Sequence, residues 1–266
     1  MRDFRAIAGR LARGFGRRGE QGWRTRSDPV RARRRALREE VDYWRDWLSN
    51  QGGKWANDYS YRLDPNAEVA DPALCEVLAS LAQKQVSILD VGAGPVSGVG
   101  YRFPGKTLSL TPVDPLADQY GRLLAKRGID PPARTERAEG ERLLQRFGPD
   151  RFDIAYSRNA LDHAVDPVLI IENMLGVVRP EGYVVLRHVR NEAVNQAYVQ
   201  LHQWNFDERD GRFVIWRPGY ESDLTETLAG RAETHCRLES NDKDEGAGWV
   251  VCVIRKLRGE ATLGAP

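Results

Sequence analysis

The strongest constraint on the fold is an apolar run that ends in a glycine turn, Ile88-Leu89-Asp90-Val91-Gly92-Ala93-Gly94. Such a run is typical of a buried parallel strand, and the two glycines allow the backbone to turn tightly against a ligand. A second strand-like segment runs from Leu108 to Val113 and ends at Asp114. An acid at the tip of the second strand usually binds ribose hydroxyls in nucleotide-binding folds. The pattern therefore predicts a cofactor that contains a nucleoside.

The glycine spacing argues against a dinucleotide. A dinucleotide fingerprint requires G-x-G-x-x-G at the start of a helix, so that the pyrophosphate lies at the helix N-terminus. Here the third position after Gly94 is Ser97, and Pro95 and Gly98 make a poor first helical turn. The loop lacks the usual pyrophosphate site, and the short segment before Thr107 leaves little room for a crossover helix.

Further strands are predicted after this first pair. The apolar run Phe152–Ser157 forms a fourth strand candidate, and Tyr183–His188 follows a proline-glycine turn as a fifth. The segments Ala232–Leu238 and Trp249–Lys256 have the pattern of a closing antiparallel pair. Between the fifth strand and this pair, Phe213–Trp216 is a short strand-like insertion.

This order of motifs resembles the class I S-adenosylmethionine-dependent methyltransferases over roughly residues 86–256. The resemblance implies an α/β, Rossmann-like sheet that is mostly parallel, with an antiparallel closing strand, and S-adenosylmethionine as the cofactor. It also implies that the first glycine loop lies beside the methionine part of the cofactor, that Asp114 holds the ribose and that Glu139 meets the adenine amino group. The full set of cofactor-binding residues that we expect is Asp90, Gly92, Ala93, Gly94, Asp114, Glu139, Gly140 and Ser157.

Positive charge is concentrated at the start of the chain. Residues 1–40 contain 13 Arg against five Asp and Glu, a net charge of +8, while the whole chain carries only +2. We expect residues 1–27 to form a basic, flexible arm, which is either solvated or docks on a membrane surface or an anionic partner. No DNA- or RNA-binding module accompanies the arginines, so nucleic acid is not an expected partner.

Residues 28–84 are expected to form an N-terminal helical extension, with helices from Asp28 to Asn50 and from Pro72 to Gln83. Trp44 and Trp47 are spaced to bury one side of the first helix. In the family such helices cover the cofactor or shape the acceptor pocket; the alternative is that these residues pack on the sheet edge. The methyltransferase domain is expected at residues 85–258, followed by a tail at 259–266.

The cysteine pattern and the hydropathy predict a cytoplasmic protein. Cys75, Cys236 and Cys252 are odd in number and lack C-x-x-C spacing, which is typical of reduced thiols. The sequence contains no apolar run of membrane-spanning length and no signal-peptide core.

Three of the four histidines follow the fourth and fifth strands. An alcohol acceptor must lose a proton during methyl transfer, and neutral imidazole accepts a proton near pH 7. His163, next to Asp162, is our first candidate for a general base, and His188 is the second. The alternative for His163 is packing against the cofactor or capping of a helix.

A metal ion is a separate hypothesis. Asp162, His188 and Glu192 follow neighbouring strand ends, and convergence of these residues would create a site for Mg²⁺. The alternative is a solvated Asp, a hydrogen-bonded His and a Glu at a helix start. We expect that helix to extend from Glu192 to Trp204.

The acceptor class is narrowed by the segment after the fourth strand. It reads Ser157-Arg158-Asn159-Ala160 rather than the N-P-P-[YF] of amino-group methyltransferases. Two segments resemble sugar O-methyltransferases of the mycobacterial methylmannose polysaccharide type: Asn-Ala-Leu-Asp-His-x-x-Asp-Pro at 159–167, and Leu-His-Gln-Trp-Asn-Phe, which contains His202 and Trp204. This implies a sugar or oligosaccharide acceptor, with His202 and Trp204 as substrate contacts. The alternatives are a small-molecule O- or N-methyltransferase of secondary metabolism and a catalytically silent, cofactor-binding partner subunit; the oligomeric state stays open.

Overall fold

The computed structural model describes residues 29–240 and 248–258 of the 266-residue chain. The expected basic arm at 1–27 and the tail at 259–266 lie outside the described residues. Within the described ranges, no helix is both long enough and apolar enough to cross a membrane.

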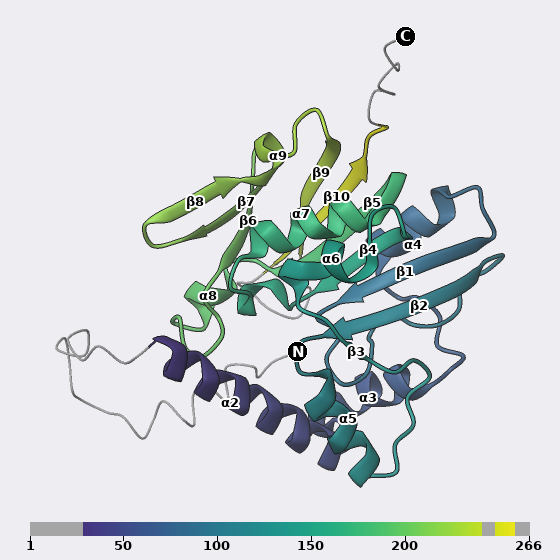
Figure 1. Cartoon of the computed structure of the whole chain (residues 1–266), viewed down its shortest axis with the longest axis vertical. Coiled ribbons are helices and arrows are strands. Elements are labelled where there is room, and N and C mark those ends of the chain that lie inside the picture. The colour runs from purple at the N-terminus through teal and green to yellow at the C-terminus, as the bar shows by residue number, and fades with distance from the viewer. Residues whose placement is uncertain (1–28, 241–247, 259–266) are drawn as a thin grey trace.

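A seven-stranded sheet forms the centre of the molecule, with the strand order β3-β2-β1-β4-β5-β10-β9 (Figure 1). The first five strands run parallel, and β10 pairs antiparallel with β5 and with β9. The predicted mostly parallel sheet with an antiparallel closing strand is confirmed. The bounds are β1 (Gln85–Val91), β2 (Thr107–Asp114), β3 (Glu136–Arg137), β4 (Phe152–Arg158), β5 (Val178–Val189), β9 (Ala232–Glu239) and β10 (Trp249–Lys256).

The strand order reverses between β1 and β4, because the chain continues from β1 to β2 on one side and returns to β4 on the other. In open parallel sheets, ligands bind at the carboxyl ends of the strands near such a reversal. The segment 92–106 that links β1 to β2 contains turns and no helix, in agreement with its predicted shortness. The fold therefore leaves an open edge directly beyond β1.

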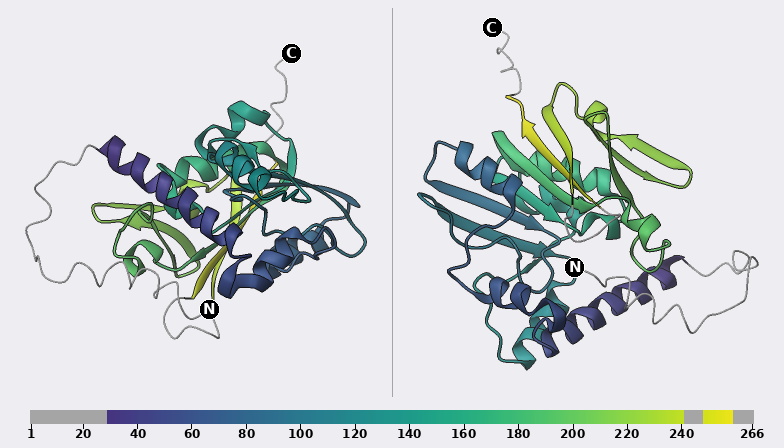
Figure 2. Two further views of the ribbon diagram at one scale, coloured as in Figure 1. Left: turned by 90° about the horizontal axis from the view of Figure 1, so that it is seen from below. Right: turned by 180° about the vertical axis from the view of Figure 1, so that it is seen from behind.

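Helices cover both faces of the sheet (Figures 1 and 2). Side chains alternate along β1, so that Ile88 packs in the core beneath α4 (Pro72–Ser80), while Leu89 packs in the core beneath α7 (Pro167–Val177). The short helix α6 (Leu143–Phe147) lies beside α7. Burial on both faces explains why β1 is a nearly continuous apolar run.

The first helix of the N-terminal extension lies at the carboxyl edge of the sheet, unlike α4. α2 (Pro29–Ser49) packs against α5 (Ala117–Lys126), and Trp47 is buried between them with Leu124. A 3-10 turn and α3 (Ala56–Leu63) follow α2. The predicted helix from Asp28 to Asn50 is confirmed as α2, which crosses the open edge of the sheet (Figure 1).

A second, three-stranded sheet was only partly predicted. It consists of β6 (Asn205–Arg209), β7 (Arg212–Arg217) and β8 (Tyr220–Asp223), in that order, and is followed by α9 (Leu224–Thr227). The strand-like insertion expected at Phe213–Trp216 lies in β7. Phe206 and Phe213 stack at 5.8 Å and join the core beneath α7.

The helix expected from Glu192 to Trp204 does not form, and this expectation was wrong. α8 (Glu192–Asn195) has only four residues. The Asn205 side chain accepts a hydrogen bond from the Val194 amide at 2.9 Å, and the Gln203 amide donates to the Asp162 carbonyl at 3.0 Å. These bonds replace helical ones, and three residues of the segment adopt positive φ: Ala197, Tyr198 and Gln200.

His188 of β5 is fully buried between the two sheets. Its ring stacks on Phe206 with centroids 4.5 Å apart, and neither ring nitrogen has a hydrogen-bond partner among the described residues. Burial lowers the pKa of His188 to about 4, even though the nearby Asp162 charge raises it. The imidazole is therefore neutral at physiological pH.

This burial predicts an acid-sensitive fold. The unfolded chain binds a proton at His188 near pH 6.5, whereas the folded chain binds it only near pH 4. The free energy of unfolding should therefore fall by about 3 kcal/mol as the pH drops from 6.5 to 4. In His188→Phe this contribution should vanish, so denaturant unfolding of the variant should depend less steeply on pH over this window. Equal slopes for both proteins would contradict the assignment.

Candidate functional site

A large cleft opens at the carboxyl edge of the sheet. It encloses about 1600 Å³ and is lined by α2, the loop after β1, the end of β2 and the segments after β3, β4 and α8. Ligand pockets for single small molecules usually measure about 300–1000 Å³. The cleft therefore has room for a nucleoside cofactor and an acceptor together.

The glycine loop forms one wall of the cleft. Gly92 has a φ of 76°, and a Cβ added there would lie 2.3 Å from the Ala160 Cβ. Gly94 has a φ of 66°, and a Cβ there would lie 2.9 Å from the Trp44 ring. Glycine is required at both positions by conformation and by space, and Ala93 between them also lines the cleft.

Two buried acids stand behind this loop. Asp114 accepts hydrogen bonds from the Leu116 amide at 2.8 Å and from the Gly94 amide at 3.1 Å. Burial raises the pKa of Asp114 to about 7, although both hydrogen bonds oppose the shift. Asp90 accepts a bond from the Ser97 hydroxyl at 2.7 Å, and burial raises the pKa of Asp90 to about 6. Both carboxyl groups line the cleft.

The other expected cofactor residues fall into two groups. Glu139 and Gly140 line the cleft next to Ala138, and a Cβ on Gly140 would lie 2.7 Å from the Ile170 side chain. Ser157 does not line the cleft: it is buried in β4 and donates its hydroxyl proton to the Val91 carbonyl at 2.8 Å. Its side chain holds β4 to β1.

Acidic groups outnumber basic ones around the cleft. Eight carboxylates line it against three guanidinium groups, which favours a cationic ligand. The acids are Glu40, Asp58, Asp90, Asp114, Glu139, Glu141, Asp162 and Glu192, and the cations are Arg33, Arg62 and Arg158.

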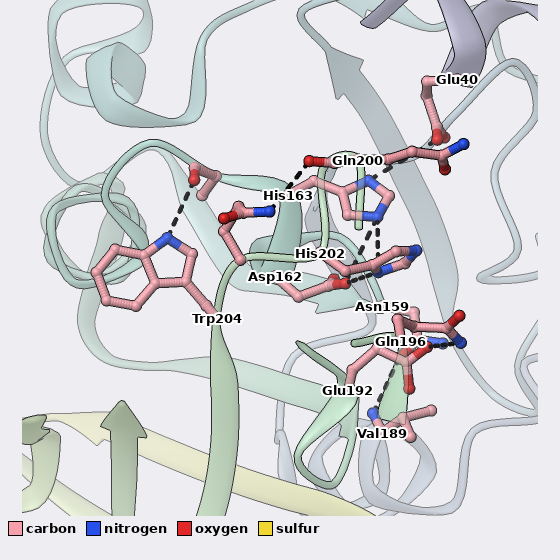
Figure 3. A network of polar contacts seen from close by, with 12 residues as sticks. Glu40, Asn159, Asp162, His163, Val189, Glu192, Gln196, Gln200, His202 and Trp204 are labelled. Atoms are coloured by element: carbon pink, nitrogen blue, oxygen red, sulfur yellow. Dashed lines mark hydrogen bonds and ion pairs between the residues drawn. The ribbon is translucent and has the colours of Figure 1, made fainter. Parts of the chain in front are cut away.

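A cluster of one acid and two histidines lines another part of the cleft, which we call the second wall (Figure 3). His202 Nδ1 lies 2.6 Å from Asp162 Oδ2, and His163 Nε2 lies 3.2 Å from His202 Nδ1 and 3.5 Å from the same Asp162 oxygen. Asp162 and His163 belong to a 3-10 turn after β4, and His202 lies in the non-helical segment that follows α8. His163, the predicted base, and His202, a predicted substrate contact, are therefore neighbours.

The charges of the cluster fix its hydrogen bonds. Burial would raise the pKa of Asp162, but the neighbouring His163 and the hydrogen bond from His202 lower it to about 2. Burial also opposes protonation of His202, yet its bond to Asp162 raises the pKa of His202 above the usual range. Because Asp162 is ionised, His202 Nδ1 must carry the proton of the 2.6 Å bond.

α2 supplies side chains to this cluster that the sequence reasoning missed. Glu40 Oε2 lies 3.9 Å from His163 Nδ1, and Arg33 donates to the His163 carbonyl at 3.3 Å. The Trp44 indole donates to Glu40 at 2.8 Å. The only sequence signal for these contacts was the apolar spacing of Trp44 and Trp47. It predicted that one face of the helix is buried, but not that this face lies against the cleft.

The expected magnesium ligands do not converge. His188 is stacked on Phe206 in the core, and Glu192 lines the cleft but accepts a bond from Gln196 at 2.9 Å. Among the described residues, only Asp162, His163 and His202 present ligand atoms within 4.8 Å of one another. Two of these three atoms are nitrogens, whereas Mg²⁺ prefers oxygen. The described residues do not fit Mg²⁺.

The placements of His188 and Trp204 also differ from the sequence-based expectations. His188 does not line the cleft, so the second candidate base has no access to an acceptor. Trp204 is buried, donates to the Ala164 carbonyl at 3.1 Å and packs edge-on against Tyr220. Trp44, Trp55 and Trp249 line the cleft instead.

Comparison with known proteins agrees with this architecture. Residues 89–186 match the family model of a methyltransferase domain. None of the curated proteins compared with the chain matches it. The CurJ carbon methyltransferase is 13% identical over 96% of this chain and 80% of its own, with a TM-score of 0.51.

Two archaeal structures are also similar. A chain from the complex of the Haloferax volcanii Trm112 methyltransferase activator with a putative methyltransferase is 15% identical, over 85% of this chain and 99% of that one, with a TM-score of 0.50. A S-adenosylmethionine-dependent methyltransferase from Methanosarcina mazei is 19% identical over 72% of this chain and 100% of that one, with a TM-score of 0.45. At such identities the likeness concerns the fold. The matched domain identifies the chain as a methyltransferase, and its sheet is Rossmann-like.

Proposed function

We propose that the protein transfers a methyl group from S-adenosylmethionine to a hydroxyl group of a sugar or short oligosaccharide. One observation carries the proposal: a single cleft is lined both by the glycine loop with Asp114, its first wall, and by the Asp162–His202–His163 cluster, its second wall. Methyl transfer requires cofactor and acceptor side by side, with a proton acceptor near the reacting oxygen.

The first wall suits S-adenosylmethionine, which supplies a methyl group on a positively charged sulfur. Each Asp114 carboxylate oxygen accepts one backbone N–H bond and retains capacity for a ribose hydroxyl. The excess of carboxylates around the cleft complements the sulfonium charge. Glu139 and Gly140, which the resemblance to the family assigns to the adenine, line the same cleft.

The second wall supplies the proton acceptor. His163 Nδ1 has no hydrogen bond among the described residues and faces Glu40. The ring proton of neutral His163 is then on Nε2, where it points to Asp162 Oδ2 at 3.5 Å, because the neighbouring His202 Nδ1 already carries a proton and cannot accept. We assign Nδ1 as the atom that takes the proton from the acceptor hydroxyl. His202 and Asp162 keep the ring in place: the two imidazoles pack edge-on with centroids 4.5 Å apart.

The lining of the cleft supports a polyhydroxylated acceptor. Trp44, Trp55 and Trp249 contribute aromatic rings to the lining, and carboxylates around the cleft can accept hydrogen bonds from hydroxyl groups. A screen of labelled-methyl transfer onto oligosaccharides, polysaccharides and small phenols or amines tests the acceptor class. Label in a saccharide, at an oxygen, supports the proposal; turnover only on an amine or a phenol would replace it.

The role of Asp114 is open to a binding measurement. In Asp114→Ala the cofactor should bind more weakly by about 1.5–3 kcal/mol for each hydrogen bond lost to the charged carboxylate. Isothermal titration calorimetry measures the change. Asp118→Ala is the matched control, because Asp118 is exposed on α5 and pairs only with the exposed Arg137. An unchanged affinity in Asp114→Ala would remove this residue from the ribose site.

The role of His163 is open to kinetics. His163→Ala should lower kcat by about 10²–10⁴-fold, the usual loss of a general base, and leave the cofactor Kd near that of the wild type. His235→Ala serves as the control, because His235 is exposed on β9. Retained turnover in His163→Ala, together with a loss in His202→Ala, would transfer the role to His202.

A further inference from the structure

We propose that Glu40 of α2 is a positioning residue for the base, and that Trp44 connects it to the glycine loop. This inference rests on the proposed role of His163, and it adds a physical link between the two walls of the cleft. The link runs from Asp114 and Gly94 through Trp44 and Glu40 to His163.

Glu40 faces the nitrogen that we assign as the proton acceptor. Its Oε2 lies 3.9 Å from His163 Nδ1, and both side chains are about one-fifth exposed, at 22% and 23%. Other titratable or charged groups also surround the residue: Asp162 and His202 lie at Nε2, Glu192 interacts with the ring electrostatically, and Arg33 donates to the backbone carbonyl. When Nδ1 is protonated, the positively charged ring and the Glu40 carboxylate are therefore within ion-pair distance. The site is partly shielded from water, which strengthens their attraction.

Trp44 orients the Glu40 carboxylate. The indole N–H, one helical turn along α2, donates to Glu40 Oε1 at 2.8 Å. The two carboxylate oxygens thus have separate tasks: Oε1 accepts from the indole, and Oε2 points to His163 (Figure 3). Without the indole, the side chain would be free to rotate away from the ring.

Trp44 is itself held against the cofactor loop. Its ring lies so close to Gly94 that a Cβ there would be 2.9 Å from it, and it packs edge-on against Trp47 at 5.3 Å. The Arg62 guanidinium lies 5.6 Å from the ring centroid. Gly94 donates its amide proton to Asp114. The position of the loop therefore sets the position of the indole, and through it that of Glu40.

The experiment compares Glu40→Gln with Glu39→Gln. The glutamine keeps an oxygen for the Trp44 indole but removes the charge that faces His163. We expect kcat to fall about tenfold to a hundredfold, the scale of a misplaced catalytic group, with a cofactor Kd within about twofold of wild type. Glu39→Gln should leave both unchanged, since Glu39 pairs with the exposed Arg35. Glu40→Asp, which restores the charge, should recover part of kcat.

Double variants separate this inference from the proposed function. If Glu40 acts through His163, adding Glu40→Gln to His163→Ala should cause no further loss of turnover. Trp44→Phe, which keeps a ring on Gly94 but removes the N–H donor, should lower kcat in the same direction.

The outcomes are distinct. A normal kcat in Glu40→Gln while His163→Ala is inactive would overturn the positioning role and leave the proposed function intact. A loss of cofactor affinity in Glu40→Gln with kcat preserved would also overturn it, because Glu40 would then be a cofactor contact. Normal turnover in His163→Ala would overturn the proposed base itself.

Discussion

The hydrogen bond from the Gly94 amide to the Asp114 carboxylate joins the ends of two neighbouring parallel strands. It holds the loop after β1 against the end of β2. This loop lines the cleft, and residues 92–106 contain no helix that could hold it in place. Gly94 can approach only because it has no side chain, and the space that a Cβ would fill belongs to Trp44. The close approach of Trp44, and through it the placement of Glu40, depends on this contact, while α5 holds the rest of α2.

Charge in the cleft is arranged for a ligand of opposite sign. Burial raises the pKa of Asp90 to about 6 and that of Asp114 to about 7, so both acids are held near the point of protonation at neutral pH. A positive charge nearby favours the ionised form of a carboxyl group. Binding of a sulfonium cofactor in this cleft would therefore favour release of a proton from Asp90 or Asp114. Asp162 differs, because its histidine neighbours keep it ionised without a ligand.

The parts of the fold that could be predicted from the sequence are those encoded locally. β1, β2 and Asp114 follow from an apolar run, a glycine turn and an acid at a strand end, and α2 follows from its apolar spacing. The Glu192–Trp204 segment has helical spacing too, but its backbone amides donate instead to the Asn205 side chain of β6 and to a backbone carbonyl of the turn after β4. The contact between Glu40 and His163 spans 123 positions, so no local pattern could indicate it.

The three-stranded sheet has a consequence for how the molecule unfolds. Phe206, Phe213 and Ile215 lie in the same buried cluster as Leu89 of β1 and Met174 of α7. Opening this sheet would expose the main core, since no separate apolar layer lies between the two sheets. Backbone amides of β7 should therefore exchange with solvent as slowly as those of β5, and the two sheets should melt in a single cooperative transition.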